Sequence, residues 1–298
     1  MRNHSLNVQD GLFDQTDIEL SYRMFRNICL VRYFEAGVID DMEKKRINIP
    51  VYLSSGQEAM AAAMATEIND FLIFTQHRAH DIFLTFGGSP AALRDELRGL
   101  PTGTSQGKAG SNCLQWFGNG IQMFGHHGLI GENVPQGVGA ALGSGKNTLC
   151  VFGDGAAEED YVLASLGFAA THKLPVLFVC VDNDLSILTE TKVRRSWRIT
   201  EVAKSFGLHA EEVADDPWAV LNCTRSAKMK LPAFLNVQVC RWFWHVGAGC
   251  DGPPAWNRFE LVKREFSSRG KGPEIQKIEM DVKAEMEQLW GKELSLKQ

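Results

Sequence analysis

The sequence has no CxxC pair, and its seven cysteines are an odd number, so neither a disulfide framework nor a zinc knuckle is indicated. Several cysteines interrupt apolar runs such as LFVCV, which is typical of buried reduced thiols in a cytosolic protein. No apolar run is long enough to span a bilayer, and the N-terminus has no apolar signal core. We therefore expect a cytoplasmic protein with no membrane partner.

The sequence also has no excess of positively charged residues. Lys and Arg number 31 against 36 Asp and Glu, and the net charge of -5 argues against the basic stripe of a nucleic-acid-binding protein. The 298 residues are 44% hydrophobic and 22% charged, as in ordinary globular proteins. The chain is long enough to bury a substantial core in one large domain or two small ones.

Helical patterns mark both ends of the chain. Between about 16 and 46, apolar residues recur at steps of three or four and predict one long amphipathic helix. From about 260 to 298, apolar residues among many charges predict a C-terminal helical extension. Ser55 followed by Glu58 forms a capping-box pattern, so a helix should begin at Ser55. Residues 101–131 are rich in Gly, Ser and Asn, and loops of this length are usually functional or disordered.

The middle of the chain alternates between strand and helix patterns. TLCVFGD predicts a strand, residues 158–172 a helix and PVLFVCVDN a second strand, which together form a βαβ unit with parallel strands. Helices at 199–206 and 217–228 and the strand AFLNVQVCRW extend the sheet. We find no repeat and no linker. The simplest fold is a single α/β domain over residues 1–298, with a doubly wound, mainly parallel sheet and helices on both faces.

Two of the predicted strands end in residues that suit a metal site. Asp154 of the GDG tripeptide follows one strand and Asn183 follows the next, so both lie where ligands bind in parallel sheets. Carboxylate and amide oxygens suit Mg²⁺, which can lie between the aspartate and a diphosphate that approaches the glycine backbone. Glu158, Glu159 and Asp160 are expected only to complement the dipole of the following helix.

Six motifs occur in the order seen in one enzyme family. They are SSGQEA at 54–59, QHRAH at 76–80, KAGS at 108–111, HGLIGENVPQGVGAAL at 127–142, GDGAAEED at 153–160 and KLPVLFVCVDN at 173–183. In these motifs the chain resembles, over roughly residues 16–265, the α-subunit of the decarboxylase component of thiamin diphosphate-dependent 2-oxo acid dehydrogenases. That group includes pyruvate, branched-chain and acetoin dehydrogenases. The resemblance implies a diphosphate-binding domain that acts on a 2-oxo acid or a related ketone.

The resemblance also implies a role for each matching residue. The implied Mg²⁺ ligands are Asp154, Asn183 and the backbone carbonyl of Leu185. The implied cofactor contacts are His77, Arg78, Gly128, Ile130, Asp154, Gly155, Ala156, Asn183 and Ile187. Among them, Arg78 would pair with the diphosphate and Ile187 would be the apolar wedge that keeps the cofactor bent.

Two histidines are implied to be catalytic. His80 and His245 would flank the thiazolium and serve in proton transfer or in stabilising the bound carboxylate, for which imidazole has a suitable pKa. His245 stands in RWFWHVGAG, at the place of the family's active-site loop histidine. Gln57 and His127 are weaker candidates on the substrate side.

The resemblance implies a partner as well. Thiamin chemistry needs a carboxylate beside the aminopyrimidine, and in this family a glutamate from a second, pyrimidine-binding domain supplies it. This chain has room for only one such α/β domain. We therefore expect a β-subunit that carries the glutamate, an α₂β₂ heterotetramer, and a possible acyltransferase partner that accepts the product.

Other interpretations stay open. Four histidines, His77, His80, His126 and His127, include an HxxH pair that is compatible with zinc. Half of a split transketolase would also carry GDG and Asn183, and a non-catalytic scaffold or regulatory subunit would keep the fold.

The sequence also departs from the family pattern. Val181 and Asp182 replace a frequent Glu-Asn pair, Leu185 replaces a tyrosine, and Cys113 stands where a histidine is common. VGAGCDGPP replaces the usual loop after His245, so the motifs do not identify the substrate or indicate regulation by phosphorylation.

Overall fold

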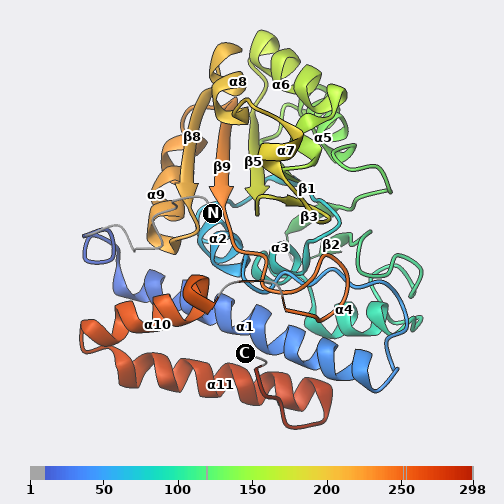
Figure 1. The fold of residues 1–298 in the computed structure, drawn as a ribbon, viewed down its shortest axis with the longest axis vertical. Coiled ribbons are helices and arrows are strands. Elements are labelled where there is room, and N and C mark those ends of the chain that lie inside the picture. Colours follow the sequence, from blue (N-terminus) through green and yellow to red (C-terminus); the bar gives the residue numbers. More distant parts are fainter. Residues whose placement is uncertain (1–10, 119, 251, 253, 297–298) are drawn as a thin grey trace.

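The computed structural model describes residues 11–118, 120–250, 252 and 254–296, and its centre is a seven-stranded sheet (Figure 1). The strands lie in the order β2-β3-β1-β4-β5-β9-β8. Their bounds are β1 Leu72–Phe74, β2 Trp116–Gly118, β3 Ile121–Phe124, β4 Thr148–Gly153, β5 Val176–Asp182, β8 His209–Ala214 and β9 Ala233–Gln238. Only the edge strand β2 is antiparallel to its neighbour in this sheet. The prediction of a mainly parallel α/β sheet is therefore confirmed.

Helices cover both faces of the sheet, because its central strands are apolar on both sides. Every residue of β5 is buried, as parallel sheets between two helical layers require. One face packs against α5 (Asn133–Ser144), α6 (Asp160–His172) and α8 (Ile199–Ser205). The other packs against α2 (Glu58–Met64) and α9 (Pro217–Lys228), with the long helix α1 (Ile18–Glu43) beyond them. This is the doubly wound arrangement.

The terminal helices lie together across the end of the sheet to which β5, β8 and β9 point (Figure 1). The helix predicted at about 16–46 is α1, and Asp17 caps it by accepting a 3.0 Å hydrogen bond from the Leu20 N–H. The predicted C-terminal extension consists of α10 (Arg258–Ser268) and α11 (Gly272–Trp290), the latter packed along α1. That residues 1–298 form one domain stays a prediction, and residues 1–10 and 297–298 lie outside the described part.

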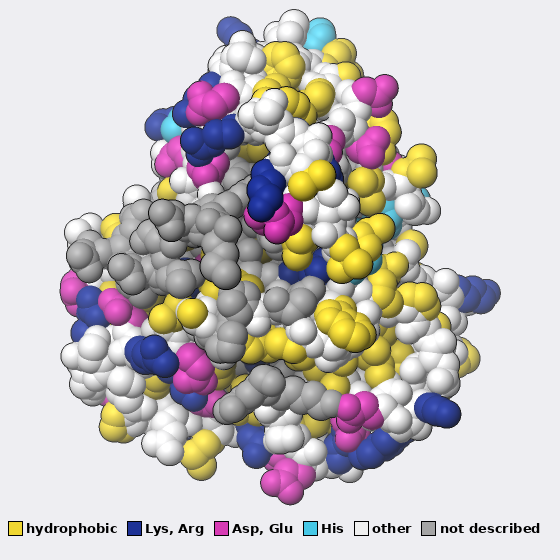
Figure 2. Space-filling view, viewed as in Figure 1, with side chains coloured by type: hydrophobic (Ala, Val, Ile, Leu, Met, Phe, Trp, Pro, Cys, Tyr) yellow, Lys and Arg dark blue, Asp and Glu magenta, His cyan; other side chains and the backbone are white. Residues whose placement is uncertain are grey.

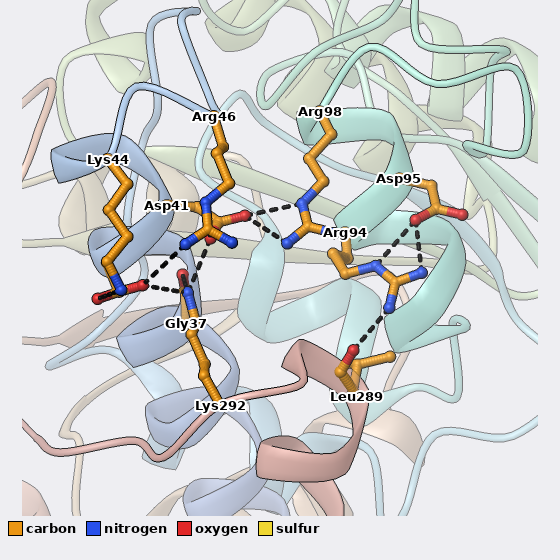
Figure 3. Close-up of polar contacts among 10 residues, drawn as sticks. Gly37, Asp41, Lys44, Arg46, Arg94, Asp95, Arg98, Leu289 and Lys292 are labelled. Atoms are coloured by element: carbon orange, nitrogen blue, oxygen red, sulfur yellow. Dashed lines mark hydrogen bonds and ion pairs between the residues drawn. The ribbon is translucent and has the colours of Figure 1, made fainter.

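A buried carboxylate joins α1, α11 and α4 (Pro90–Leu97) near their ends (Figure 3). Asp41 has no exposed surface, and its carboxylate contacts Arg98 and Lys292, each at 2.7 Å. Arg94, one turn before Arg98, donates a 2.6 Å hydrogen bond to the Leu289 carbonyl. These contacts fix the helical layer beneath the sheet.

Two local predictions are wrong because tertiary contacts compete for the same groups. The helix expected to begin at Ser55 begins at Glu58, since the Ser55 hydroxyl donates to Glu35 at 2.5 Å instead of capping the helix. Glu58 does turn back, and accepts the Gly56 N–H at 2.5 Å. The helix expected from Glu158 starts at Asp160, after the short 3-10 turn η1 (Ala156–Glu158).

The long loop expected over 101–131 has a built core. Glu96, at the end of α4, is fully buried and accepts backbone N–H groups of Ser105, Gly107, Ala109 and Gly110 at 2.6–3.1 Å. The same loop continues into the β2–β3 hairpin, which the sequence pattern did not reveal. One carboxylate thus orders a segment that otherwise has little regular structure.

None of the helices in the described ranges combines the length and the apolar character needed to cross a membrane.

Candidate functional site

The predicted site residues gather where the parallel strands end. Asp154 directly follows β4 and Asn183 directly follows β5, and these strands pair in register up to Gly153 and Val181. The ends of adjacent parallel strands lie at one edge of the sheet, so the structure brings Asp154 and Asn183 to the same place.

Asp154 is buried, with 2% of its surface exposed, and it accepts several donors. Its Oδ2 forms a close ion pair with Nη2 of Arg194 and accepts the Thr191 hydroxyl at 3.3 Å. Arg195 donates to the Asp154 backbone carbonyl at 2.9 Å. Burial raises the pKa of Asp154 to about 6, helped by the nearby Asp182 carboxylate and opposed by the two guanidinium groups. The site therefore binds positive charge.

Glu158 belongs to this ion-pair network, which corrects the expectation that it only faces the helix dipole. Its carboxylate forms a close ion pair with Nη1 of Arg194 and a second with Arg195 at 3.2 Å. Asp160, in contrast, is exposed and lies in the first turn of α6, where a carboxylate complements the helix dipole as expected.

A short β-hairpin packs against Gly155, the second glycine of the GDG tripeptide. It consists of β6 (Leu185–Ser186) and β7 (Thr189–Glu190), and α7 (Thr191–Arg194) follows directly. A Cβ at Gly155 would lie 2.6 Å from the Ser186 hydroxyl, so a larger residue there would require the Ser186 side chain to move. Ile187, at the hairpin tip, has a positive φ of 54° and is 59% exposed.

The hairpin is tied to the strand ends by backbone contacts. The Leu185 N–H donates to Oδ1 of Asn183 at 3.1 Å, and Arg241 donates to the Ile187 carbonyl at 2.9 Å. Asp182 is also engaged, since it accepts the Asn236 amide at 3.1 Å and the Asp184 N–H at 3.0 Å. The unusual Asp182 therefore orders the loop that follows β5.

Three histidines and a tyrosine form an aromatic cluster beside the strand ends. The His77 ring lies 5.5 Å from His245, 5.8 Å from His126 and 4.8 Å from Tyr52, measured between ring centroids. Burial, the Arg78 charge and the neighbouring histidines lower the pKa of His77 to about 3. Burial, Arg78 and Arg241 lower the pKa of His245 to about 4. These imidazoles are therefore neutral near pH 7.

Arg78 is buried and bridges two segments of this cluster. It donates to the Leu53 carbonyl at 2.5 Å and to the His245 carbonyl at 2.9 Å. A guanidinium that holds the backbone on both sides fixes the His245 loop relative to the SSGQEA segment.

His80 lies deeper than the other predicted histidines, with no exposed surface. Its Nδ1 contacts Oε1 of Glu35 at 2.9 Å and its Nε2 contacts the Ser111 hydroxyl at 3.0 Å. Glu35 also accepts the N–H groups of Ser54 and Ser55 at 2.6 and 2.7 Å. Both ring nitrogens of His80 are thus engaged within the protein, and Ser111 is the nearest polar group on its Nε2 side.

Gly128 and Ile130 lie in the loop after β3 and are exposed. A Cβ at Gly128 would meet no atom within 4 Å, and its φ of 139° suits glycine. The Ile130 carbonyl accepts the Tyr161 hydroxyl at 2.6 Å. This loop therefore leaves open backbone beside the strand ends, as a backbone contact to a ligand requires.

The side chains around Asp154 decide whether a divalent cation fits this site. Among the described residues no group of three His, Cys, Asp or Glu side chains is placed to hold a metal, so the HxxH pattern finds no support as a zinc site. In this structure the cation paired with Asp154 is the Arg194 guanidinium. Asp154, Asn183 and a backbone carbonyl are oxygen donors of the kind that Mg²⁺ takes alongside phosphate and water.

Sequence reasoning missed several residues of this site: Glu35, Tyr52, Ser111, Arg194 and Arg195. Glu35 lies on an apolar helix face, and Ser111 in a polar loop, so neither has a local signal. The adjacent pair of arginines after the hairpin was visible in TETKVRRSW. Two adjacent guanidinium groups shortly after a predicted phosphate loop are a usable signal for ion pairing with its carboxylates.

Comparison with known sequences identifies similar proteins. The family model described as "Dehydrogenase E1 component" matches residues 26–235. The pyruvate dehydrogenase E1 component subunit alpha-1, mitochondrial, of Arabidopsis thaliana is 30% identical over 238 residues, which are 74% of this chain and 59% of that protein. The pyruvate dehydrogenase E1 component subunit alpha of Rickettsia bellii is 30% identical over 274 residues, 86% of this chain and 81% of that protein.

Solved structures show a similar fold at low identity. Transketolase from Campylobacter jejuni matches 93% of this chain and 47% of its own chain, with a TM-score of 0.59 and 14% identity. Transketolase from Leishmania mexicana matches 93% of this chain and 48% of its own, with a TM-score of 0.56 and 14% identity. The chain thus spans about half the length of these structures and 59% of the Arabidopsis relative.

Proposed function

Since the chain belongs to the dehydrogenase E1 component family, we propose that it is the α-subunit of a thiamin diphosphate- and Mg²⁺-dependent 2-oxo acid dehydrogenase. The enzyme would decarboxylate a 2-oxo acid, or cleave a related ketone, and pass the product to an acceptor. The observation that carries this proposal is the buried, cation-binding carboxylate of Asp154 at the end of β4, beside the end of β5. When bound, thiamin diphosphate supplies the electron sink for such a reaction.

Residues at the strand ends would hold the cofactor's diphosphate and its metal. Asp154, Asn183 and the Leu185 carbonyl would bind Mg²⁺, and backbone N–H groups of Gly155 and Ala156 would approach the diphosphate. The Ser186 side chain packed against Gly155 supports this, because it shows that the backbone there admits close approach. Of the other implied contacts, Arg78 holds two backbone segments, His77 belongs to the aromatic cluster, Gly128 and Ile130 offer backbone groups, and Ile187 is exposed at the hairpin tip.

The histidines would differ in their roles. His245 is half-buried and belongs to the aromatic cluster, so it is placed to contact a substrate and to accept a proton as a neutral imidazole. His80 is enclosed by Glu35 and Ser111, which favours a positioning role exerted through the Ser111 hydroxyl. The predicted catalytic role of His80 in contact with a substrate stays a prediction.

A β-subunit would complete the site. Loops that leave the carboxyl ends of three strands expose large apolar side chains, and Figure 2 shows apolar side chains gathered on one face. The most exposed in each loop are Leu129 at 66% after β3, Leu188 at 77% after β5 and Trp244 at 55% after β9. Contiguous exposed apolar surface marks an interaction site. We propose that a β-subunit supplying the glutamate binds here, in an α₂β₂ heterotetramer.

The surroundings of the enzyme follow from the same proposal. An acyltransferase would accept the product. None of the seven cysteines, all of which lie in the described ranges, forms a disulfide, which supports a reducing compartment, and we propose the cytoplasm.

Calorimetry with thiamin diphosphate and Mg²⁺, on the chain with its β-subunit, tests the proposal. We expect binding to the wild-type protein and none to Asp154→Ala, because that change removes the charged ligand of the metal. The matched control is Glu159→Ala, five residues away, whose side chain makes no capping hydrogen bond to α6 and which should bind normally. Absence of binding to the wild-type complex at millimolar cofactor would refute the proposal.

A transketolase-like activity is the second candidate, and the fold shared with transketolases favours it. Turnover of a sugar phosphate donor in place of any 2-oxo acid would select it. Cofactor binding without turnover of either donor would indicate a scaffold or regulatory subunit.

A further inference from the structure

Arg194 is paired with Oδ2 of Asp154, one of the two oxygens with which this carboxylate could bind a metal ion. Its guanidinium contacts Oδ2 of Asp154 and Oε1 of Glu158, and its Nη2 donates to the Thr191 hydroxyl at 2.9 Å. Its Nε donates to the Thr189 carbonyl at 3.2 Å. The side chain is 11% exposed. This arginine is therefore held at Asp154 by several contacts and is not a mobile surface cation.

Arginines of the chain itself neutralise much of the negative charge around Asp154, where the Asp182 carboxylate also lies nearby. Two carboxylates, Asp154 and Glu158, face two guanidinium groups, Arg194 and Arg195. A buried carboxylate is costly to leave unpaired, so an internal cation keeps the site stable when no metal is bound. A divalent cation at Asp154 would lie against the Arg194 guanidinium at close range. The two like charges would repel each other across the carboxylate, because Arg194 is paired with its Oδ2.

Arg194 also lies over the diphosphate cradle. A Cβ at Gly155 would be 3.7 Å from Nη1 of Arg194 and 2.6 Å from the Ser186 hydroxyl. The hairpin and α7 therefore cover Gly155 and Asp154 together. Since Arg194 ends α7, moving its side chain off Asp154 uncovers the carboxylate without disrupting β4 or β5.

We propose that Arg194 is the resident cation of the Asp154 site and that a divalent metal binds by displacing it. The proposal rests on the assignment of Asp154 as a metal ligand in the proposed function. It gives the chain two states, one in which the guanidinium neutralises Asp154 and one in which the metal does so. A metal that must displace a bound guanidinium binds with an apparent Kd equal to the intrinsic Kd divided by the fraction of chains in which the site is open.

Binding of Mn²⁺ alone to the full-length chain, followed by electron paramagnetic resonance of free Mn²⁺, tests the displacement. If the open form is about 10% populated, Arg194→Ala and Arg194→Gln each lower the apparent Kd about tenfold. Arg198→Ala is the matched control, because Arg198 is nearby in sequence, 64% exposed and paired with Glu212 at 2.8 Å. It should leave Mn²⁺ binding unchanged.

A double variant locates the site. Asp154→Asn in the Arg194→Ala background should abolish the gain, since the carboxylate that Arg194 released is then gone. Unchanged or weaker Mn²⁺ binding in both folded Arg194 variants overturns the inference, as does a gain that survives Asp154→Asn. Thiamin diphosphate binding to the wild-type complex separates this from the proposed function. If thiamin diphosphate binds to the complex but the Arg194 variants bind Mn²⁺ no more tightly, the displacement is refuted and the proposed function stands. If the variants bind Mn²⁺ more tightly but thiamin diphosphate does not bind, the proposed function is refuted and the displacement stands.

Discussion

Burial sets the protonation state of the histidines in the aromatic cluster. His77 and His245 both have pKa values below the usual range of histidine, first because burial disfavours the imidazolium and then because Arg78 lies nearby. Each imidazole is therefore ready to accept a proton near pH 7 but holds one only weakly.

The titration of His245 can be measured in the isolated chain. We expect its imidazole NMR signal, assigned with His245→Gln, to titrate near pH 4. Because the folded-state pKa is lower than the unfolded one, the unfolded chain binds more protons between about pH 4 and 6.5. Stability should therefore fall as pH drops through this range.

Replacing His245 removes one contribution to that loss. The stability of His245→Gln should depend less on pH between 4 and 6.5 than that of the wild type, as measured by urea unfolding at several pH values. A midpoint at the ordinary histidine value would contradict the assigned environment.

At the scale of elements, a single glycine sets how closely two helices pack. Gly37 of α1 faces Trp290 at the end of α11, and a Cβ at Gly37 would lie 2.3 Å from the indole ring. Trp290 is 4% exposed and also contacts the Phe34 ring at a centroid distance of 5.3 Å. The indole cannot withdraw without leaving this packing.

Gly37→Ala should destabilise the chain by about 1–3 kcal/mol, the usual cost of overpacking a helix contact. Gly139→Ala in α5 is the matched control, because a Cβ there meets no atom within 4 Å. It should stabilise the chain by about 0.5–1 kcal/mol through helix propensity. Thermal unfolding of both variants checks the opposite signs, and equal effects would show that α11 does not pack on Gly37 in solution.

At the scale of the whole molecule, the ion-pair network around Asp41 joins three helices that are far apart in sequence (Figure 3). Asp41→Ala leaves Arg98 and Lys292 without their shared buried partner and should cost about 3 kcal/mol. Lys44→Ala is the control, because the Lys44–Asp40 pair is exposed and contributes about 0.5 kcal/mol or less. Urea unfolding compares the two, and a similar small loss in both would show that the network is dispensable.

The spacing of apolar and polar residues in the sequence predicted the sheet but not every residue of the candidate site. Asp154 and Asn183 were predictable because parallel strands in register bring successive strand ends to one edge. Ser111 and Arg194 were not, because each reaches the site through a loop whose path depends on tertiary contacts. The order of Ser111's loop depends on Glu96, and the position of Arg194 depends on the hairpin. The capping box at Ser55 failed for the same reason, since Glu35 competes for its hydroxyl.

Glu35 makes the long helix α1 more than a packing element. Its two carboxylate oxygens accept hydrogen bonds from the N–H groups of Ser54 and Ser55 and from the Ser55 hydroxyl, and one of them contacts Nδ1 of His80. Ser54 and Ser55 lie in a loop, and His80 begins α3 (His80–Thr85). Aspartate would be one methylene too short for these donors, and glutamine would turn a donor toward backbone N–H groups. Glu35 lies outside every phosphate motif, yet its carboxylate orders the segments that carry Ser54, Ser55 and His80, so its replacement in a related chain would remove that support from the site.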